Sequence, residues 1–478
     1  MLRKQQFPIS VTVFVLRQYN IIMAHKEALT NVDTAWLRMD TPSNLMMISG
    51  VMMFEAPLDR KALRSVLERR FLCFDRFRQR VNDRDSSPYW EEDPHFNLDN
   101  HLHRVALPAP GDQETLQAFV SDLMSTPLNF ARPLWDLHLV ENFGNGCAVI
   151  VRIHHCIADG MALIRVLLSM TDSEPTPTES VVPSPLRDAS SDRSSGVARL
   201  LKSVTATAGD FVAGSLDLVR NPGLIFDRAR QGVNLAAVIA KLGLMGSDSL
   251  TQFKGDLGVR KCAAWTEPMP LNDVKQIGKA MGGTVNDVLM TAAAGALRRY
   301  LITHRQPVDG VEIRAIVPVN LRPIKEPPRL GNHFGLVFLS LPVGVEDPSH
   351  RMRLVRKRMD VIKGSMEAVV AIGILHAIGM APPILQKQVV KRFSVMASAV
   401  LTNVPGPREQ LYLAGIPLGR IMFWVPRAGA VGMGISILSY NGEVLMGFAT
   451  DAGLVPDPQA LTSALKAEYE ALREAVAL

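Results

Sequence analysis

The pattern of apolar and polar positions divides the chain of 478 residues into two α/β halves. In the first half, residues 145–153 read as a turn and then a buried strand, because a short apolar run rich in β-branched residues suits the middle of a sheet. Residues 161–170 follow with the apolar spacing of a helix. The sequence therefore predicts a strand-to-helix junction over residues 154–160, where a side chain projects from a rigid edge into a cleft.

A polar segment separates the two halves. Residues 171–196 are rich in Ser, Pro and Thr and contain almost no large apolar side chains, so we expect a flexible linker. Residues 197–255 are expected to form a helical connector, because apolar residues recur there with helical spacing to about residue 245. The chain exceeds the size at which one core stops growing. We therefore expect an N-terminal domain over residues 23–170 and a C-terminal domain over residues 256–478.

The first 22 residues begin basic and turn apolar, but Arg17 and Gln18 interrupt the apolar run and no small-residue cleavage site follows. We expect residues 1–22 to be an N-terminal extension outside the fold.

The second half contains a helix start with its own capping residues. Gly282 and Gly283 form a turn, Thr284 is placed to cap the helix, and Asp287 three residues on completes a pairing similar to a capping box. A helix is therefore predicted from about residue 284 through the apolar residues that follow.

Strands are predicted further along the second half. Buried strands are expected to end at Arg322 and to cover residues 334–343. Residues 435–451 predict a hairpin that turns at the Asn-Gly pair 441–442. The sequence TNVPGP at residues 402–407 is expected to lie outside regular structure.

Composition and charge are those of an ordinary globular protein, with 47% hydrophobic and 21% charged residues. The formal charge of +6 favours an anionic neighbour, such as a membrane surface or a nucleotide-bearing substrate, and no nucleic-acid motif is present. The longest apolar stretch, residues 369–385, is broken by His376 and two prolines, so no spanning helix is expected. The four cysteines show neither C-x-x-C spacing nor a secreted disulfide framework, which favours free thiols in the cytoplasm.

The predicted junction carries two adjacent histidines in the sequence IHHCIADG. A histidine near neutral pKa is the usual side chain for removing a proton from a hydroxyl group that attacks a carbonyl. Because adjacent side chains in an extended segment point to opposite faces, one of His154 and His155 faces the interior and the other the cleft. The same geometry argues against a metal site. No G-x-S-x-G elbow is present, and Cys156 is best read as a small buried hydrophobe, which favours direct transfer without a covalent intermediate.

His154, His155, Asp159 and Gly160 match the HHxxxDG signature of the acyl-CoA-dependent acyltransferase and condensation superfamily. More narrowly, the chain from about Leu29 to its C-terminus resembles the bacterial wax ester synthase/acyl-CoA:diacylglycerol acyltransferase family. The segments that carry this resemblance are LTNVDTAWLRMD, ARPLWDLHLVE, VNDV, VPVNLRP, GNHFGLVFLSLP, TNVPGP and GISILSYNGEVLMGFATD. The resemblance implies two chloramphenicol-acetyltransferase-like α/β domains with mixed sheets and a tunnel between them.

The resemblance also implies roles for the residues of the signature. His155 becomes the general base and His154 its structural neighbour, and Gly160 completes the motif. Asp159 becomes an orienting acid that holds the loop through an ion pair, for which Arg322 is the candidate partner.

Two further family motifs match. Asn286 in the ND motif is placed to donate a hydrogen bond to the developing oxyanion, while Asp287 is at least equally well explained as a helix cap. Pro133, Leu134 and Trp135 match the PLW motif, for which packing is at least as good an explanation as catalysis.

The implied activity is transfer of a long acyl chain from acyl-CoA to diacylglycerol or a long-chain fatty alcohol, giving triacylglycerol or wax ester. Acyl-CoA is then a substrate, and no cofactor is expected. We expect a cytoplasmic protein that associates peripherally with a membrane or lipid inclusions and binds no nucleic acid. The alternatives are a carrier-protein-dependent condensation-type acyltransferase and a non-catalytic lipid-droplet-binding protein.

Overall fold

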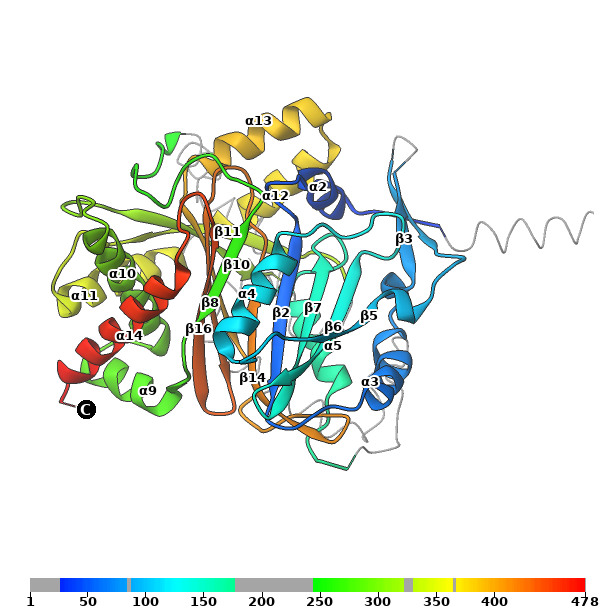
Figure 1. Ribbon diagram of the computed structural model, residues 1–478. Coiled ribbons are helices and arrows are strands. Elements are labelled where there is room, and N and C mark those ends of the chain that lie inside the picture. The colour runs from blue at the N-terminus through cyan, green and yellow to red at the C-terminus, as the bar shows by residue number, and fades with distance from the viewer. Residues whose placement is uncertain (1–25, 84–86, 177–243, 322–329, 364–366, 478) are drawn as a thin grey trace, which may run out of the picture.

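The structure is a computed structural model that describes residues 26–83, 87–176, 244–321, 330–363 and 367–477 (Figure 1). The expected N-terminal extension, most of the linker and the connector up to residue 243 lie outside the described residues.

A six-stranded sheet forms the first half of the molecule. Its strand order is β13-β14-β2-β7-β6-β5, in which β5 and β6 are parallel and the other neighbours antiparallel. The bounds are β2 Met47–Phe54, β5 Leu102–Ala106, β6 Trp135–Phe143, β7 Gly146–His154, β13 Tyr412–Leu413 and β14 Ile416–Trp424. Two strands from near the end of the chain thus complete the sheet of the first half. A separate small sheet joins β1 Glu27–Ala28, β4 Tyr89–Glu92 and β3 Gln79–Asn82.

A second sheet has the order β11-β10-β12-β15-β16-β8, with β9 also paired to β16. Its strands are β8 Lys261–Trp265, β9 Met269–Pro270, β10 Ile313–Asn320, β11 Phe334–Leu341, β12 Ala399–Pro405, β15 Met433–Tyr440 and β16 Glu443–Asp451. Parallel pairing of β12 with β10 and β15 makes this sheet mixed as well. The expected α/β architecture with two mixed sheets is confirmed.

Helices cover both sheets. Their bounds are α2 Asn31–Met39, α3 Arg60–Val66, α4 Gln113–Met124, α5 Gly160–Met170, α9 Leu271–Ala280, α10 Val285–Thr303, α11 Pro348–Lys363, α12 Glu367–Met380, α13 Pro383–Ser394 and α14 Pro458–Glu474. Helices α9, α10, α11 and α14 gather on one side of the second sheet, and α13 lies at the edge of the molecule (Figure 1). Helix α12 packs on β11 and on α2 of the first half. No helix of the described residues is both long and apolar enough to cross a bilayer.

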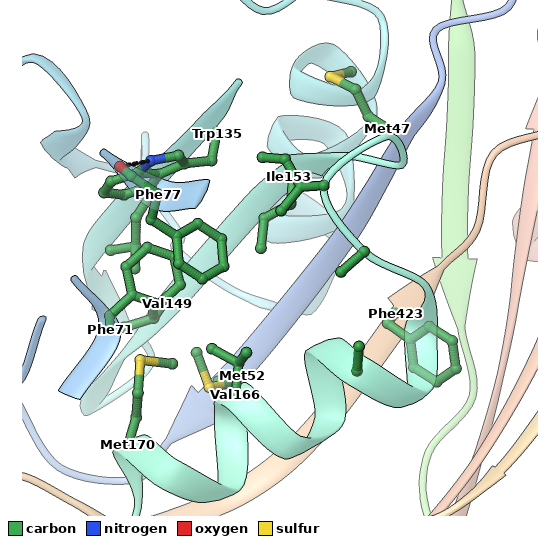
Figure 2. Packing of buried hydrophobic residues seen from close by; sticks show 14 of the residues in the cluster. Met47, Met52, Phe71, Phe77, Trp135, Val149, Ile153, Val166, Met170 and Phe423 are labelled. Atoms are coloured by element: carbon green, nitrogen blue, oxygen red, sulfur yellow. Dashed lines mark hydrogen bonds between the residues drawn. The ribbon is translucent and has the colours of Figure 1, made fainter. Parts of the chain in front are cut away.

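Each half has its own hydrophobic core, and a third cluster joins the two sheets. The core of the first half packs Met47 and Met52 of β2, Trp135 of β6, Val149 and Ile153 of β7 and Met170 of α5 (Figure 2). In the joining cluster, Trp265 of β8 and Trp424 of β14 lie with ring centroids 5.6 Å apart. Because β14 pairs with β2 and also contacts β15 and β16, the two sheets are held together by apolar packing.

Most local elements follow the sequence prediction. The predicted strand and helix around the histidine pair are β7 and α5, and the helix predicted from residue 284 is α10, whose capping box is complete. The strands β10 and β11 and the hairpin β15–β16 are also present, with positive φ at Asn441 (47°) and Gly442 (81°) in its turn. These predictions are confirmed because each depended on local patterning.

The expectation that residues 402–407 lie outside regular structure is wrong. Residues 402–405 belong to β12, where Asn403 pairs with Ile437 and Pro405 with Ser439 of β15. The described pairing of β12 with β10 involves only Ala399 and Val400. Pro405 is tolerated because it ends the strand, where a missing N–H group costs no central hydrogen bond.

Candidate active site

The loop between β7 and α5 is held by backbone hydrogen bonds on both sides. The N–H group of His154 donates to the carbonyl of Leu134 (2.9 Å), and that of His155 donates to the carbonyl of Met46 (2.7 Å). Asp159 is the N-cap of α5, and its Oδ1 atom accepts from the N–H group of Ala162 (2.9 Å). The residues from 154 to 159 are therefore fixed by the central strands and by the helix they start.

The two histidines face different surroundings. The ring of His155 contributes to the wall of the cavity described below, whereas His154 is fully buried and does not line it. His154 Nδ1 accepts from the N–H group of Cys156 (3.1 Å), and its Nε2 lies 3.4 Å from Asp40 Oδ2. One histidine therefore faces the cavity and the other the interior, as expected from the alternation of side chains along an extended segment.

The imidazole of His155 is enclosed by aromatic side chains. Trp36 of α2 stacks on it with ring centroids 4.1 Å apart and planes 20° apart, and Phe334 of β11 lies 5.6 Å away. Burial lowers the pKa of His155 to about 4, against an opposing effect of the Asp159 carboxylate. Its Nδ1 atom is buried without a hydrogen-bond partner. The ring is therefore neutral over the physiological pH range, as a proton acceptor must be.

Three consecutive residues of the second half clamp this loop. Gly331, with φ at 107°, accepts from the N–H group of Asp159 (3.2 Å) and donates to the carbonyl of Ile157 (3.0 Å). The N–H group of His333 donates to Asp159 Oδ2 (3.0 Å). Asn332 completes the clamp, since its side-chain amide donates to the carbonyl of His155 (2.7 Å).

The same Asn332 amide group also donates to Asp33 Oδ1 (2.8 Å), which connects the clamp to α2. Asp33 is buried, and burial raises its pKa although the hydrogen bonds from Asn332 and Thr30 lower it. Sequence analysis missed Trp36, Asp33 and Asn332 as neighbours of His155. Their only sequence signal was that they lie in two of the segments that carry the family resemblance.

The residues of the ND motif have different positions. Asn286 lines the cavity, and its Oδ1 atom accepts from the side-chain amide of Asn403 (2.5 Å). Asp287 is buried, and its Oδ2 atom accepts from the N–H and hydroxyl groups of Thr284, both at 2.8 Å. Asp287 is therefore a helix cap in this structure, and Asn286 is the member of the motif that reaches the cavity.

The PLW segment lies in the core of the first half. Leu134 and Trp135 are fully buried, and none of Pro133, Leu134 and Trp135 lines the cavity. The indole of Trp135 donates to the carbonyl of Phe77 (2.9 Å), as the dashed line in Figure 2 shows. The segment thus supports β6 beside the active-site strand by packing.

The cavity has a volume of about 720 Å³ and is lined from both halves of the molecule. Such a volume falls in the range of small-molecule binding sites. Trp36, His155, Asp159 and Gly160 come from the first half. Apolar side chains of the second half form much of the remaining wall, including Leu336, Phe338, Ile374, Leu375, Ile378, Val390 and Phe393. A tunnel-like space between the halves was expected, and the cavity occupies that position.

Basic side chains also line the cavity. Lys275 and Lys279, one helical turn apart on α9, are exposed, and Arg408 after β12 is exposed as well. An apolar chamber with basic groups on its wall fits a molecule that has a long hydrocarbon part and an anionic part.

Arg322, the expected partner of Asp159, is not described by the structure, because it falls in residues 322–329. Cys156 is fully buried away from the cavity, as expected for a small buried hydrophobe, and burial raises the pKa of its thiol. A thiol in that state is a poor nucleophile. In the described part of the chain, no group of three His, Cys, Asp or Glu side chains is placed to hold a metal ion.

Comparison with known proteins gives consistent matches over nearly the whole chain. Residues 29–289 match the model of the wax ester synthase/diacylglycerol acyltransferase catalytic domain, and residues 330–473 match the model of the C-terminal domain of the same proteins. A putative diacylglycerol O-acyltransferase of Mycobacterium tuberculosis is 28% identical over 461 residues, which cover 91% of this chain and 88% of that protein. A probable diacylglycerol O-acyltransferase of the same bacterium is 28% identical over 90% of this chain and 92% of that protein.

Solved structures with the same fold include a wax ester synthase/diacylglycerol acyltransferase from Marinobacter aquaeolei VT8. It superposes with a TM-score of 0.66 at 22% identity and covers 95% of this chain and 100% of its own. The first condensation domain of the calcium-dependent antibiotic synthetase superposes with a TM-score of 0.57 at 15% identity, over 95% of this chain and 96% of that domain.

Proposed function

The chain belongs to the wax ester synthase/diacylglycerol acyltransferase family, and from this premise we propose that it transfers a long acyl chain from coenzyme A to the hydroxyl group of diacylglycerol or of a long-chain fatty alcohol. The single observation that carries the proposal is the neutral ring of His155 in the wall of a largely apolar cavity. A long chain gains about 0.8 kcal/mol for each methylene buried in such a chamber.

His155 acts as the general base in this proposal. Because Nδ1 is enclosed by protein, Nε2 is the ring nitrogen available to a substrate. As the hydroxyl oxygen attacks the thioester carbonyl carbon, its proton moves to Nε2 and a C–O bond forms. The C–S bond then breaks, and the departing thiolate of coenzyme A takes the proton from the imidazolium. The base returns to its neutral form.

Two residues assist that step. The negative charge of Asp159 favours the imidazolium form of His155, because it opposes the effect of burial on the pKa. The oxygen of the Asn286 side chain is engaged by Asn403, which leaves its NH₂ group to donate toward the oxyanion of the tetrahedral intermediate. Direct transfer needs no acyl-enzyme, in keeping with the buried thiol of Cys156.

The two substrates differ in chemistry and use different parts of the cavity wall. Lys275, Lys279 and Arg408 are the groups we assign to the phosphates of coenzyme A. The apolar wall from β11, α12 and α13 is left for hydrocarbon chains. An acceptor such as diacylglycerol resides in a lipid phase, so the protein is proposed to work at the surface of a membrane or lipid inclusion.

Ester formation tests the proposal. Pure protein is incubated with labelled palmitoyl-CoA and either hexadecanol or dioleoylglycerol, and labelled ester and free coenzyme A are measured together. We expect ester and coenzyme A in equal amounts with at least one acceptor. Release of coenzyme A without ester, or neither product with either acceptor, would reject the proposal.

A further inference from the structure

The turn between α12 and α13 exposes large apolar side chains close together. Met380, Ile384 and Leu385 are 69%, 76% and 49% exposed. Nine large apolar side chains of the described residues are more than 40% exposed, and three of them fall within residues 380–385. Apolar side chains scattered singly on a surface need no explanation, whereas a cluster indicates an interaction surface. We call Met380, Ile384 and Leu385 the apolar tip.

Basic side chains accompany the apolar tip. Lys387 and Lys391 are exposed and one helical turn apart on α13, and Arg392 is exposed beside them. No Asp or Glu occurs between Glu367 and Glu409, although acidic residues number 46 in 478 along the whole chain. A helix that presents apolar groups at one end and lysines along its length has the pattern of a helix that lies in a membrane interface.

The same two helices form part of the cavity wall. The lining residues include Ile374 and Ile378 of α12 and Val390 and Phe393 of α13. Helix α13 packs on α12 and α2 and lies at the edge of the molecule (Figure 1), and its Phe393 stacks on Phe338 of β11 with ring centroids 6.4 Å apart. The apolar tip therefore belongs to the same pair of helices whose other side chains line the cavity.

We propose that the apolar tip and the lysines of α13 dock the protein on a lipid surface that carries anionic headgroups. Ile384 and Leu385 enter the boundary between headgroups and acyl chains, and Lys387 and Lys391 contact the headgroup phosphates. The inference rests on the proposed function, since docking there brings the cavity wall close to the phase that holds the acceptor. Charge complementarity favours this occupant over a second copy of the chain, whose identical lysines would repel. A nucleic acid is a poorer occupant, because its phosphates would contact the lysines but would give the exposed apolar side chains of the tip no apolar partner.

Vesicle flotation with the full chain tests the docking surface. Vesicles of phosphatidylcholine alone are compared with vesicles that also contain phosphatidylglycerol. The test variants are I384S/L385S and K387E/K391E, none of whose residues lines the cavity. The matched controls are I302S/V361S, at exposed apolar positions on α10 and α11, and R353E/K357E, which are exposed and one turn apart on α11. Melting curves establish that each variant folds.

We expect wild type and both controls to float with the anionic vesicles, and both test variants to bind them at least about tenfold more weakly. Test variants should match wild type with detergent-dispersed decanol but lose activity toward dioleoylglycerol held in vesicles. Equal flotation of test variants and controls overturns the docking surface. So does a wild-type dimer that the test substitutions dissociate, because a second copy then covers the tip. Absence of ester in wild type with every acceptor would instead count against the proposed function.

Discussion

The side-chain amide of Asn332 donates a hydrogen bond of 2.7 Å to the backbone carbonyl of His155, from which it is separated by 177 positions in the chain. With a second bond to Asp33, this amide ties the second half of the molecule and helix α2 to the residue proposed as the base. Asn332 is therefore a positioning residue for His155, without contact to the reacting atoms.

Replacing Asn332 by alanine should misplace the imidazole. We expect kcat to fall about 10-fold to 100-fold, because a small displacement of a general base slows the proton transfer. KM for acyl-CoA should change little, because Asn332 is not among the residues that we assign to acyl-CoA binding. Loss of the two hydrogen bonds should cost about 1–3 kcal/mol of stability. Steady-state kinetics and urea unfolding measure both quantities.

Asn44 offers a matched control for that substitution. Its side-chain amide also donates to a carbonyl of the other half, but that carbonyl belongs to Gly429 (3.0 Å) and not to His155. Asn44→Ala should lose comparable stability and keep its turnover. Equal losses of kcat in both variants would show that Asn332 acts only through general stability.

The pH dependence of kcat/KM should report the lowered pKa of His155. A base works in its deprotonated form, so activity is present above the folded pKa and is lost as pH falls through about 4. An exposed histidine would instead lose activity as pH falls through about 6.5. Initial rates and a melting curve at each pH separate titration of the base from loss of the fold. An acid limb near 6.5 in folded enzyme would be inconsistent with a buried neutral ring.

Substitutions of Asp159 should separate its capping role from its charge. Asp159→Ala removes the cap of α5 and the acceptor for the His333 N–H group, which should cost about 1–3 kcal/mol. Asp159→Asn keeps one oxygen acceptor for the cap but turns its NH₂ group toward the His333 N–H group, so it should lose less stability than Asp159→Ala without matching wild type. Its kcat should still fall about tenfold, because the charge that favours the imidazolium is gone. Full turnover in Asp159→Asn would exclude the electrostatic role.

Charge reversal on α9 should weaken binding of acyl-CoA. The double substitution K275E/K279E is expected to raise KM for palmitoyl-CoA at least about tenfold and to change kcat by less than about threefold. R353E/K357E on α11 reverses a similarly spaced pair that does not line the cavity, and it should leave KM near the wild-type value. Similar KM values in the two variants would show that Lys275 and Lys279 do not bind the phosphates of coenzyme A.

Local features of this fold were predictable from sequence, and contacts between distant segments were not. The β7–α5 junction and the Thr284 cap follow from apolar spacing and cap chemistry within a few residues. The pairing of β14 with β2 joins Ile421 to Met52, and no periodicity in either strand indicates its partner. The stacking of Trp36 on His155 likewise depends on how α2 packs.

In the candidate site too, local features were predictable from sequence and contacts between distant segments were not. Alternation along an extended segment predicted that only one of His154 and His155 would reach the cleft, and the structure places His155 there. The residues around it come from α2 and from the segment before β11, which the sequence places far from the histidine pair. The error at residues 402–405 arose because prolines were read as breakers, without the parallel pairing to β15 that accommodates them.

The central claim is that one imidazole removes the proton of the acceptor hydroxyl. The most direct measurement compares ester formation from labelled palmitoyl-CoA and hexadecanol or dioleoylglycerol by wild type and His155→Ala, with His138→Gln as a control at a buried histidine that does not line the cavity. We predict that His155→Ala turns over about 10²-fold to 10⁴-fold more slowly, with a melting temperature near wild type and a fully active control. Ester formation by His155→Ala at the wild-type rate would contradict the account.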